Sequence, residues 1–151
     1  MTPAQLQFLR ECERGAREAG HCFPRMAACE AALESGYGTS ELATKYLNYF
    51  GLKQHHHPIF GSIVLPTKEV LNGAVVTISA TWIVYPTLRD CFTDRMSTLT
   101  HLAPTYPHYA AALAAPDPET YVREVSRSWS TDPNRAATCI AIYNAYNAQN
   151  V

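Results

Sequence analysis

One glutamate of this 151-residue chain lies where a carboxyl group could act as a proton donor. Glu34 follows three apolar residues and precedes Ser35-Gly36-Tyr37-Gly38, whose glycines predict the end of a helix. The negative end of a helix dipole and apolar neighbours both disfavour an ionised carboxylate, so we expect a raised pKa for Glu34. Such a group can protonate the leaving oxygen in glycoside hydrolysis. The alternative is a solvated glutamate at a helix end.

Other reactive residue types form no recognisable pattern. His55, His56 and His57 are consecutive and precede Pro58, so they do not converge on one ion as an i, i+4 helix pair would. We therefore favour a solvated loop and expect neither a metal site nor a cofactor. The five cysteines include no CxxC pair, and four of them fall on predicted apolar helix faces, where cysteine behaves as a small hydrophobic residue.

Helix signals dominate the chain on both sides of Glu34. Proline at a first helical position and Thr, Ser or Asp at an N-cap predict where helices begin. These starts are Thr2-Pro3, Phe23-Pro24, Thr39 or Ser40, Thr87, Asp117-Pro118 and Asp132-Pro133. The second helix is expected to end at Glu34-Ser35 and the third at about Tyr46. Proline-bearing loops are expected at 101–107 and 115–118.

A β-hairpin is predicted at about 62–85. Asn72-Gly73 lies between two β-prone segments and favours a type I′ turn, in which both central residues need positive φ. The second strand alternates, and its apolar face is expected to hold Val76, Ile78, Ala80, Trp82 and Val84. The sequence therefore predicts a mainly helical α+β fold with one inserted hairpin lobe.

Length and charge restrict the class of protein. A chain of this size fits a single domain spanning 1–151. Twelve Lys and Arg against thirteen Asp and Glu give a net charge of −1 without any basic run, which argues against nucleic acid as a partner. Apolar stretches are too short for membrane insertion, and the first residues lack the features of a secretory signal.

Four ordered motifs resemble the glucosaminidase domain family of peptidoglycan hydrolases, glycoside hydrolase family 73, which includes the flagellar muramidase-like domain. The first comprises AALESGYGTS at 31–40 and, after it, NYFGLK at 48–53. The hairpin entry TKEVLNG at 67–73 is similar to the family's T-x-E-Y-x-x-G. WIVYPT at 82–87 and WSTDPN at 129–134 are similar to its F-R-x-Y-x-S and Y-A-T-D-P-x. This resemblance implies a lysozyme-like fold.

The resemblance also implies roles for particular residues. It places Glu34 on the catalytic acid and Glu69 on a second carboxylate of the β-lobe, which would act as a base or stabilise positive charge. For Glu69 the alternative is a solvated hairpin charge. The implied substrate-binding residues are Tyr37, Asn48, Tyr85 and Trp129.

Two positions depart from the family pattern. Arg135 stands where the family often has a tyrosine that orients substrate or intermediate, so that role is either lost or taken by Tyr85 or another ring. Tyr37 stands where tryptophan is commoner, yet it still offers a flat face to a sugar.

The resemblance predicts cleavage of the β-1,4 bond between N-acetylglucosamine and N-acetylmuramic acid in the glycan strand of peptidoglycan. A lytic transglycosylase and a non-catalytic glycan-binding module are the alternatives. We expect a monomer that is made in the cytoplasm and acts on the periplasmic side or in the cell wall. Delivery as an antibacterial effector, with a cognate immunity protein in the producer, is favoured over a phage lysin.

Overall fold

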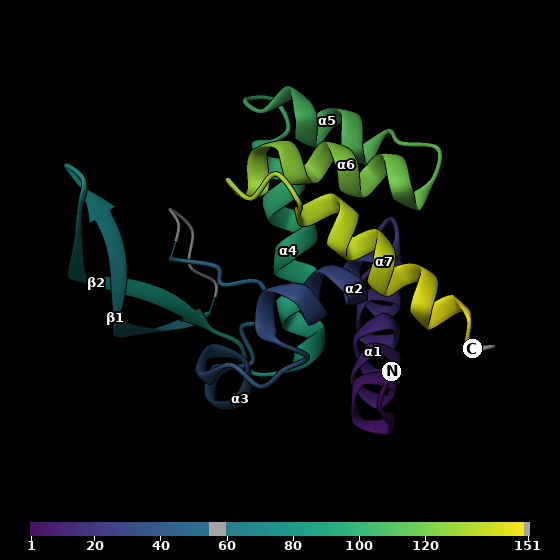
Figure 1. Ribbon diagram of the computed structural model, residues 1–151, viewed down its shortest axis with the longest axis horizontal. Helices are drawn as coiled ribbons and strands as arrows, with labels where there is room; N and C mark the ends of the chain where they lie inside the picture. Colours follow the sequence, from purple (N-terminus) through teal and green to yellow (C-terminus); the bar gives the residue numbers. More distant parts are fainter. Residues whose placement is uncertain (55–59, 150–151) are drawn as a thin grey trace.

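The computed structural model describes residues 1–54 and 60–149. Its elements in chain order are α1 (Pro3–Glu18), α2 (Pro24–Ser35), α3 (Glu41–Tyr46), β1 (Gly61–Leu71), β2 (Ala74–Val84), α4 (Leu88–Leu102), α5 (Pro107–Leu113), α6 (Pro118–Trp129) and α7 (Arg135–Asn147). The helices form one body, and the two strands extend away from it (Figure 1). The predicted α+β class with an inserted hairpin is confirmed.

Local capping explains most helix starts. The Thr2 side chain accepts a hydrogen bond from the Gln5 amide, and the Gln5 side chain accepts one from the Thr2 amide, which completes a capping box. Ser40, Thr87 and Asp117 accept the corresponding amide bonds at α3, α4 and α6. Each of these caps satisfies an amide that has no partner inside its helix, so the sequence alone is enough to predict it.

Helix α2 is the central helix of the body and carries Glu34 near its C-terminus. Its middle is rich in buried alanine, and it packs against α1 on one side and α7 on another (Figure 1). Gly36 ends it in the left-handed conformation, with φ of 58°, as the glycine signal predicted. The Ser35 hydroxyl donates to the Ala31 carbonyl and accepts from the Gly38 amide, which fixes the turn that follows Glu34.

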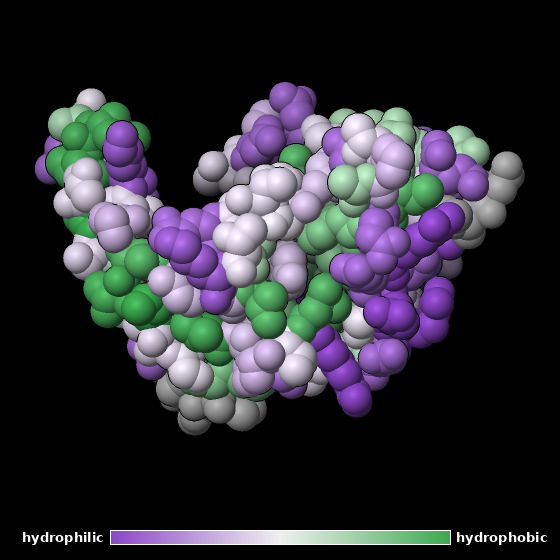
Figure 2. Space-filling view, turned by 90° about the horizontal axis from the view of Figure 1, so that it is seen from below, coloured by the Kyte–Doolittle hydropathy of each residue, from purple (hydrophilic) through white to green (hydrophobic). Residues whose placement is uncertain are grey.

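Strands β1 and β2 form an antiparallel hairpin in which Leu71 pairs with Ala74 and Gly61 with Val84. Asn72 and Gly73 both have positive φ, 52° and 79°, as the type I′ turn requires. Figure 2 shows the hairpin as an arm separated from the helical body by a hollow, with apolar residues on its surface.

The prediction that the apolar face of β2 is its buried face was wrong. Ile83, on the opposite face from the predicted apolar set, is the buried residue of the strand, whereas Ile78 is 41% exposed. The cause is that the helical body covers only the base of the hairpin, so its outer part exposes both faces. Apolar residues exposed along this outer part include Val64, Val70, Leu71 and Val75.

Two further expectations need correction. No helix start was predicted between the loops at 101–107 and 115–118, but a short helix, α5, begins there at Pro107. The last helix begins at Arg135 and not at Asp132-Pro133. Asp132 instead accepts a hydrogen bond from the Asn134 amide at 2.9 Å, so its carboxylate stabilises the turn before the helix.

Candidate active site

A cavity of about 590 Å³ lies between the base of the hairpin and the helical body. Four aromatic side chains line it, and they come from four different segments: Phe50, Trp82, Tyr109 and Trp129. Glu34 and Lys53 supply its charged groups, and Ser130 and Thr131 supply hydroxyls. Among the described residues, Glu34 is the one carboxylate that lines this cavity.

Glu34 lies at the cavity wall with its carboxylate partly exposed, at 26% of the side chain. Its Oε1 accepts a hydrogen bond of 2.8 Å from Nε of Arg135, at the first position of α7. This charge-assisted contact is absent from the sequence-based picture, in which only apolar neighbours and the helix dipole acted on Glu34. The contact holds one oxygen of the Glu34 carboxyl group against a buried guanidinium.

Arg135 belongs to a buried network of charges behind Glu34. Its Nη2 donates to Oε2 of Glu30 at 2.8 Å, and Nη2 of Arg95 donates to the same oxygen at 2.6 Å. The other oxygen of Glu30 accepts from the Tyr121 hydroxyl at 2.8 Å. Glu30 is one helical turn before Glu34 on α2, and its side chain is fully buried.

The network keeps Glu30 ionised. Burial alone would raise the pKa of Glu30, but the charges of Arg95 and Arg135 outweigh burial and lower that pKa to about 2. The same carboxylate raises the pKa of Arg135 above its ordinary value, although burial acts in the opposite direction. Glu30 is therefore a buried carboxylate shared by two guanidinium groups.

Histidine 21 extends the network away from the cavity. Nδ1 of His21 accepts from the Phe23 amide at 3.3 Å, and Nε2 lies 3.4 Å from the Tyr121 hydroxyl. Burial, reinforced by the charge of Arg95, lowers the pKa of His21 to about 3. The ring is therefore neutral, with its proton on Nε2 directed towards Tyr121.

The aromatic wall is tied to this network through Arg95. The guanidinium of Arg95 lies 4.4 Å from the ring centre of Phe50 and 4.1 Å from that of Trp129. Its Nε and Nη1 are buried without a hydrogen-bond partner in the part of the chain that the structure describes. Trp129, an expected substrate-binding residue, thus lines the cavity while its ring packs against the buried guanidinium of Arg95.

Glu69, on β1, lies outside the lining of the cavity. Its Oε1 is 3.4 Å from Nζ of Lys53, which does line the cavity, and both side chains are substantially exposed. Lys53 also pairs with Trp82 through an isolated bridge and lies 5.4 Å from the Trp82 ring centre. Glu69 is therefore linked to the cavity through Lys53, at its hairpin side.

The other expected substrate-binding residues lie away from the cavity lining. The Asn48 amide is buried and donates to the carbonyls of Leu52 and Ile83, so it joins the loop after α3 to the base of the hairpin. The Tyr85 hydroxyl is also buried and donates to Asp94 at 2.5 Å. Tyr37 is partly buried, with its ring edge-on to Phe8. None of these three side chains lines the cavity, although Asn48 hydrogen-bonds Leu52, which does.

Sequence reasoning missed Glu30, Arg95 and the role of Arg135 beside Glu34. One signal was present, because Glu30 is a charged residue inside the alanine-rich run of α2, four residues before Glu34. A buried glutamate at that spacing requires a cationic partner, which the local sequence does not supply.

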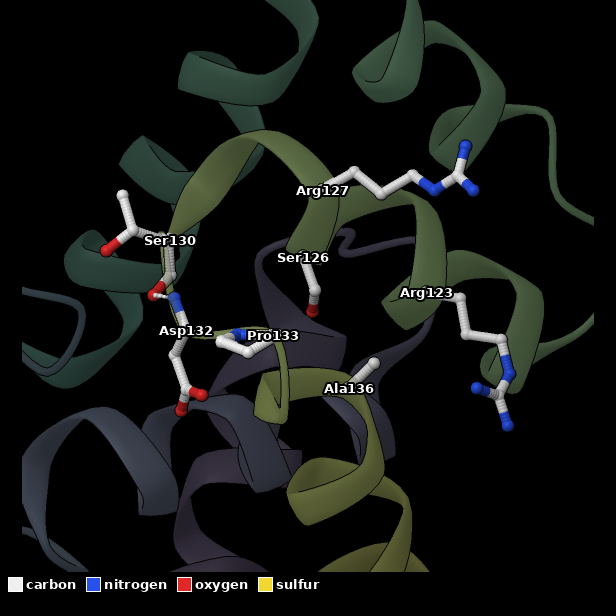
Figure 3. Close-up of a pocket in the computed structure, with 8 residues that line it drawn as sticks. Arg123, Ser126, Arg127, Ser130, Asp132, Pro133 and Ala136 are labelled. Carbon is white, nitrogen blue, oxygen red and sulfur yellow. Dashed lines mark hydrogen bonds between the residues drawn. The ribbon is translucent and has the colours of Figure 1, made fainter.

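A second cavity, of about 600 Å³, lies on the other side of the Ser130-Thr131 segment, which lines both. Figure 3 shows Ser126 pointing towards the turn that holds Asp132 and Pro133, while Arg123 and Arg127 extend away from it. The Ser126 hydroxyl accepts from Nη1 of Arg135 at 2.9 Å. Arg135 therefore lies between the two cavities.

Residues 1–54 and 60–149 hold neither a cluster of metal-binding side chains nor a membrane-spanning helix. No group of three or more His, Cys, Asp or Glu side chains capable of holding a metal ion is found there. The His55 to His57 segment lies outside the described residues. Helices in the same part of the chain all lack the combined length and apolar character of a membrane span. The five cysteines are free, and four of them are buried.

The chain belongs to the glucosaminidase family, whose model, described as mannosyl-glycoprotein endo-beta-N-acetylglucosaminidase, matches residues 13–148. Among curated proteins, it is 30% identical over 97% of its length to a "Probable N-acetylmuramidase" of Lactococcus lactis subsp. lactis, of which it covers 34%. The chain thus spans about a third of the length of that relative.

Solved structures show the same fold. The catalytic domain of the autolysin Auto from Listeria monocytogenes has a TM-score of 0.83 at 21% identity, over 99% of this chain and 88% of that one. A glycoside hydrolase domain of Salmonella typhimurium FlgJ has a TM-score of 0.74 at 26% identity, over 95% and 98%. The expected lysozyme-like fold is confirmed.

Proposed function

We propose that this chain is a peptidoglycan glycosidase that hydrolyses the β-1,4 bond between N-acetylglucosamine and N-acetylmuramic acid, with Glu34 as general acid. The observation that carries the proposal is that Glu34, among the described residues, is the one carboxylate in the lining of an aromatic-walled cavity. Membership of the glucosaminidase family supports glycosidase chemistry at this place.

The geometry of the Glu34 carboxyl suits a proton donor. Oε1 is held by Arg135, and Oε2 has no hydrogen-bond partner among the described residues. One oxygen is therefore available to carry a proton to a glycosidic oxygen bound in the cavity. Flat rings such as Trp82 and Trp129 suit the apolar faces of pyranose sugars.

Glu69 supplies the second carboxylate in this proposal. It lies on the hairpin, an element that is covered by the body only at its base and that can approach a bound glycan. A substrate in the cavity would compete for Lys53, which now pairs with Glu69. Glu69 would then activate water or stabilise the oxocarbenium-like transition state after closure of the hairpin.

The test is product analysis on purified sacculi, with the released fragments reduced and weighed by mass spectrometry. The proposal predicts hydrolysed fragments with N-acetylglucosamine at the reducing end. Fragments that are lighter by one water before reduction and that are not reduced would identify a lytic transglycosylase, and N-acetylmuramic acid at the reducing end would identify a muramidase. Binding without release of any fragment would show a non-catalytic module.

A further inference from the structure

Arg135 makes contacts to three different side chains from a fully buried position. Nε donates to Glu34, Nη1 to Ser126 and Nη2 to Glu30, at distances of 2.8, 2.9 and 2.8 Å. Every nitrogen of the planar guanidinium therefore has a fixed partner. A lysine ammonium would supply the charge without this geometry.

We infer that Arg135 is a positioning residue for the general acid: it fixes Oε1 of Glu34 so that Oε2 faces the cavity. This inference rests on the proposed function of Glu34. A glutamate at a helix end has several rotamers of similar energy, and a strong bond on one oxygen selects among them. Misplacement of a reacting atom by about 1 Å can cost roughly 10²-fold in rate.

The remainder of the network holds Arg135 in place. Glu30 binds its Nη2, and Glu30 is in turn held by Arg95 from α4 and Tyr121 from α6. Because three helices and the start of α7 converge here, Arg135 cannot follow Glu34 if the carboxylate moves. Arg135 is thus held in place by the network, and its bond to Glu34 restrains the carboxyl group.

The test compares Arg135→Gln and Arg135→Lys with wild type, by kcat and KM on soluble glycan fragments. Arg135→Gln should lower kcat by roughly 10- to 100-fold with KM within about twofold. Arg135→Lys should lose kcat as well, because a lysine keeps the charge but not the planar geometry that fixes Glu34.

Two further variants separate positioning from general damage. Ser126→Ala removes one bond of Arg135 without touching Glu34, and it should lower kcat by less than Arg135→Gln does. In a Glu34→Gln background, adding Arg135→Gln should change the residual rate by less than about twofold, because both act through one carboxyl group.

Two outcomes would overturn the inference: a folded Arg135→Gln protein with wild-type kcat, or losses that add independently in the double variant. If Arg135→Gln does not fold, Arg135→Lys decides, since unchanged kcat in that variant contradicts positioning by the guanidinium. A wild-type protein that cuts no glycan would instead refute the proposed function, and it is distinguished by its activity alone.

Discussion

The two candidate carboxylates are supported in opposite ways. Glu34 is attached to a network in which Glu30 and Arg95 have side chains at 0% exposure, joined by a bond of 2.6 Å. Glu69 pairs with Lys53 at 3.4 Å, where the two side chains are 37% and 52% exposed. The first is a rigid site built into the body, and the second is a surface pair on a two-stranded arm.

Because of this difference, one site can hold one carboxylate in place and leave the other free to move. An exposed ion pair contributes about 0–1 kcal/mol, so it can open and let the hairpin move. A buried pair cannot open cheaply, because either charge left alone in the interior is strongly destabilising. We therefore expect substitutions in the network to affect folding and substitutions on the hairpin to affect turnover.

The largest expected effect on stability is at Glu30. Glu30→Gln should lower the free energy of unfolding by about 3–5 kcal/mol, because it leaves Arg95 and Arg135 without their shared carboxylate. Urea unfolding measures this difference. The matched variant Glu69→Gln should stay within about 1 kcal/mol of wild type. Equal losses in both variants would remove the distinction between the two regions.

The rate of glycan cleavage by a Glu69 variant tests the hairpin side of the comparison. Glu69→Gln should slow glycan cleavage by roughly 10²-fold if the carboxylate activates water or stabilises positive charge. The melting temperature should stay close to that of wild type, since the side chain is partly exposed. Near-normal turnover would assign this step to the acetamido group of the substrate or to another residue.

Acid should weaken the network before it affects the hairpin. His21 has a folded-state pKa of about 3, below its unfolded value of roughly 6.5, so its contribution is complete above pH 6.5 and falls as pH decreases. Between pH 7 and pH 5 this amounts to a loss of about 2 kcal/mol. Glu30, with its lowered pKa, adds a further loss only below about pH 4.5.

Chemical unfolding at pH 7 and pH 5 measures the acid effect, and His21→Gln is the control. That variant should be less stable at pH 7, yet its stability should change little between the two pH values. A wild-type protein that is equally stable at both would show that folding does not lower the pKa of His21.

The smallest expected effect is that of chelation. Turnover should be unchanged by EDTA, because the proposed mechanism uses two carboxylates and no metal ion. Cleavage that stops with EDTA and returns with zinc would show that the His55 to His57 segment binds a metal needed for activity.

Local sequence signals predicted what depends on local interactions. The capping residues Thr2 and Asp117, the Gly36 stop after Glu34 and the Asn72-Gly73 turn each act within a few residues, and each is confirmed. The location of Glu34 at a helix end follows from the same signals. The resemblance to a glucosaminidase supplied the family and the fold.

Contacts between distant segments could not be predicted in this way. Arg135 meets Glu30 across 105 residues and Arg95 meets it across 65, so no periodicity or motif connects them. For the same reason, the alternation of β2 indicated a strand but not which face the body covers. The start of α7 was misplaced because Asp132 forms a turn of its own before the helix.

The most direct test of the central claim is the initial rate of glycan release from purified sacculi by Glu34→Gln. Glutamine is nearly isosteric and can still accept a hydrogen bond from Arg135, but it cannot donate a proton as an acid. With an unchanged melting temperature, the rate should fall by roughly 10²–10⁴-fold, whereas Glu41→Gln, at an exposed glutamate of α3, should match wild type. Release by Glu34→Gln at close to the wild-type rate would contradict the assignment of Glu34 as the general acid.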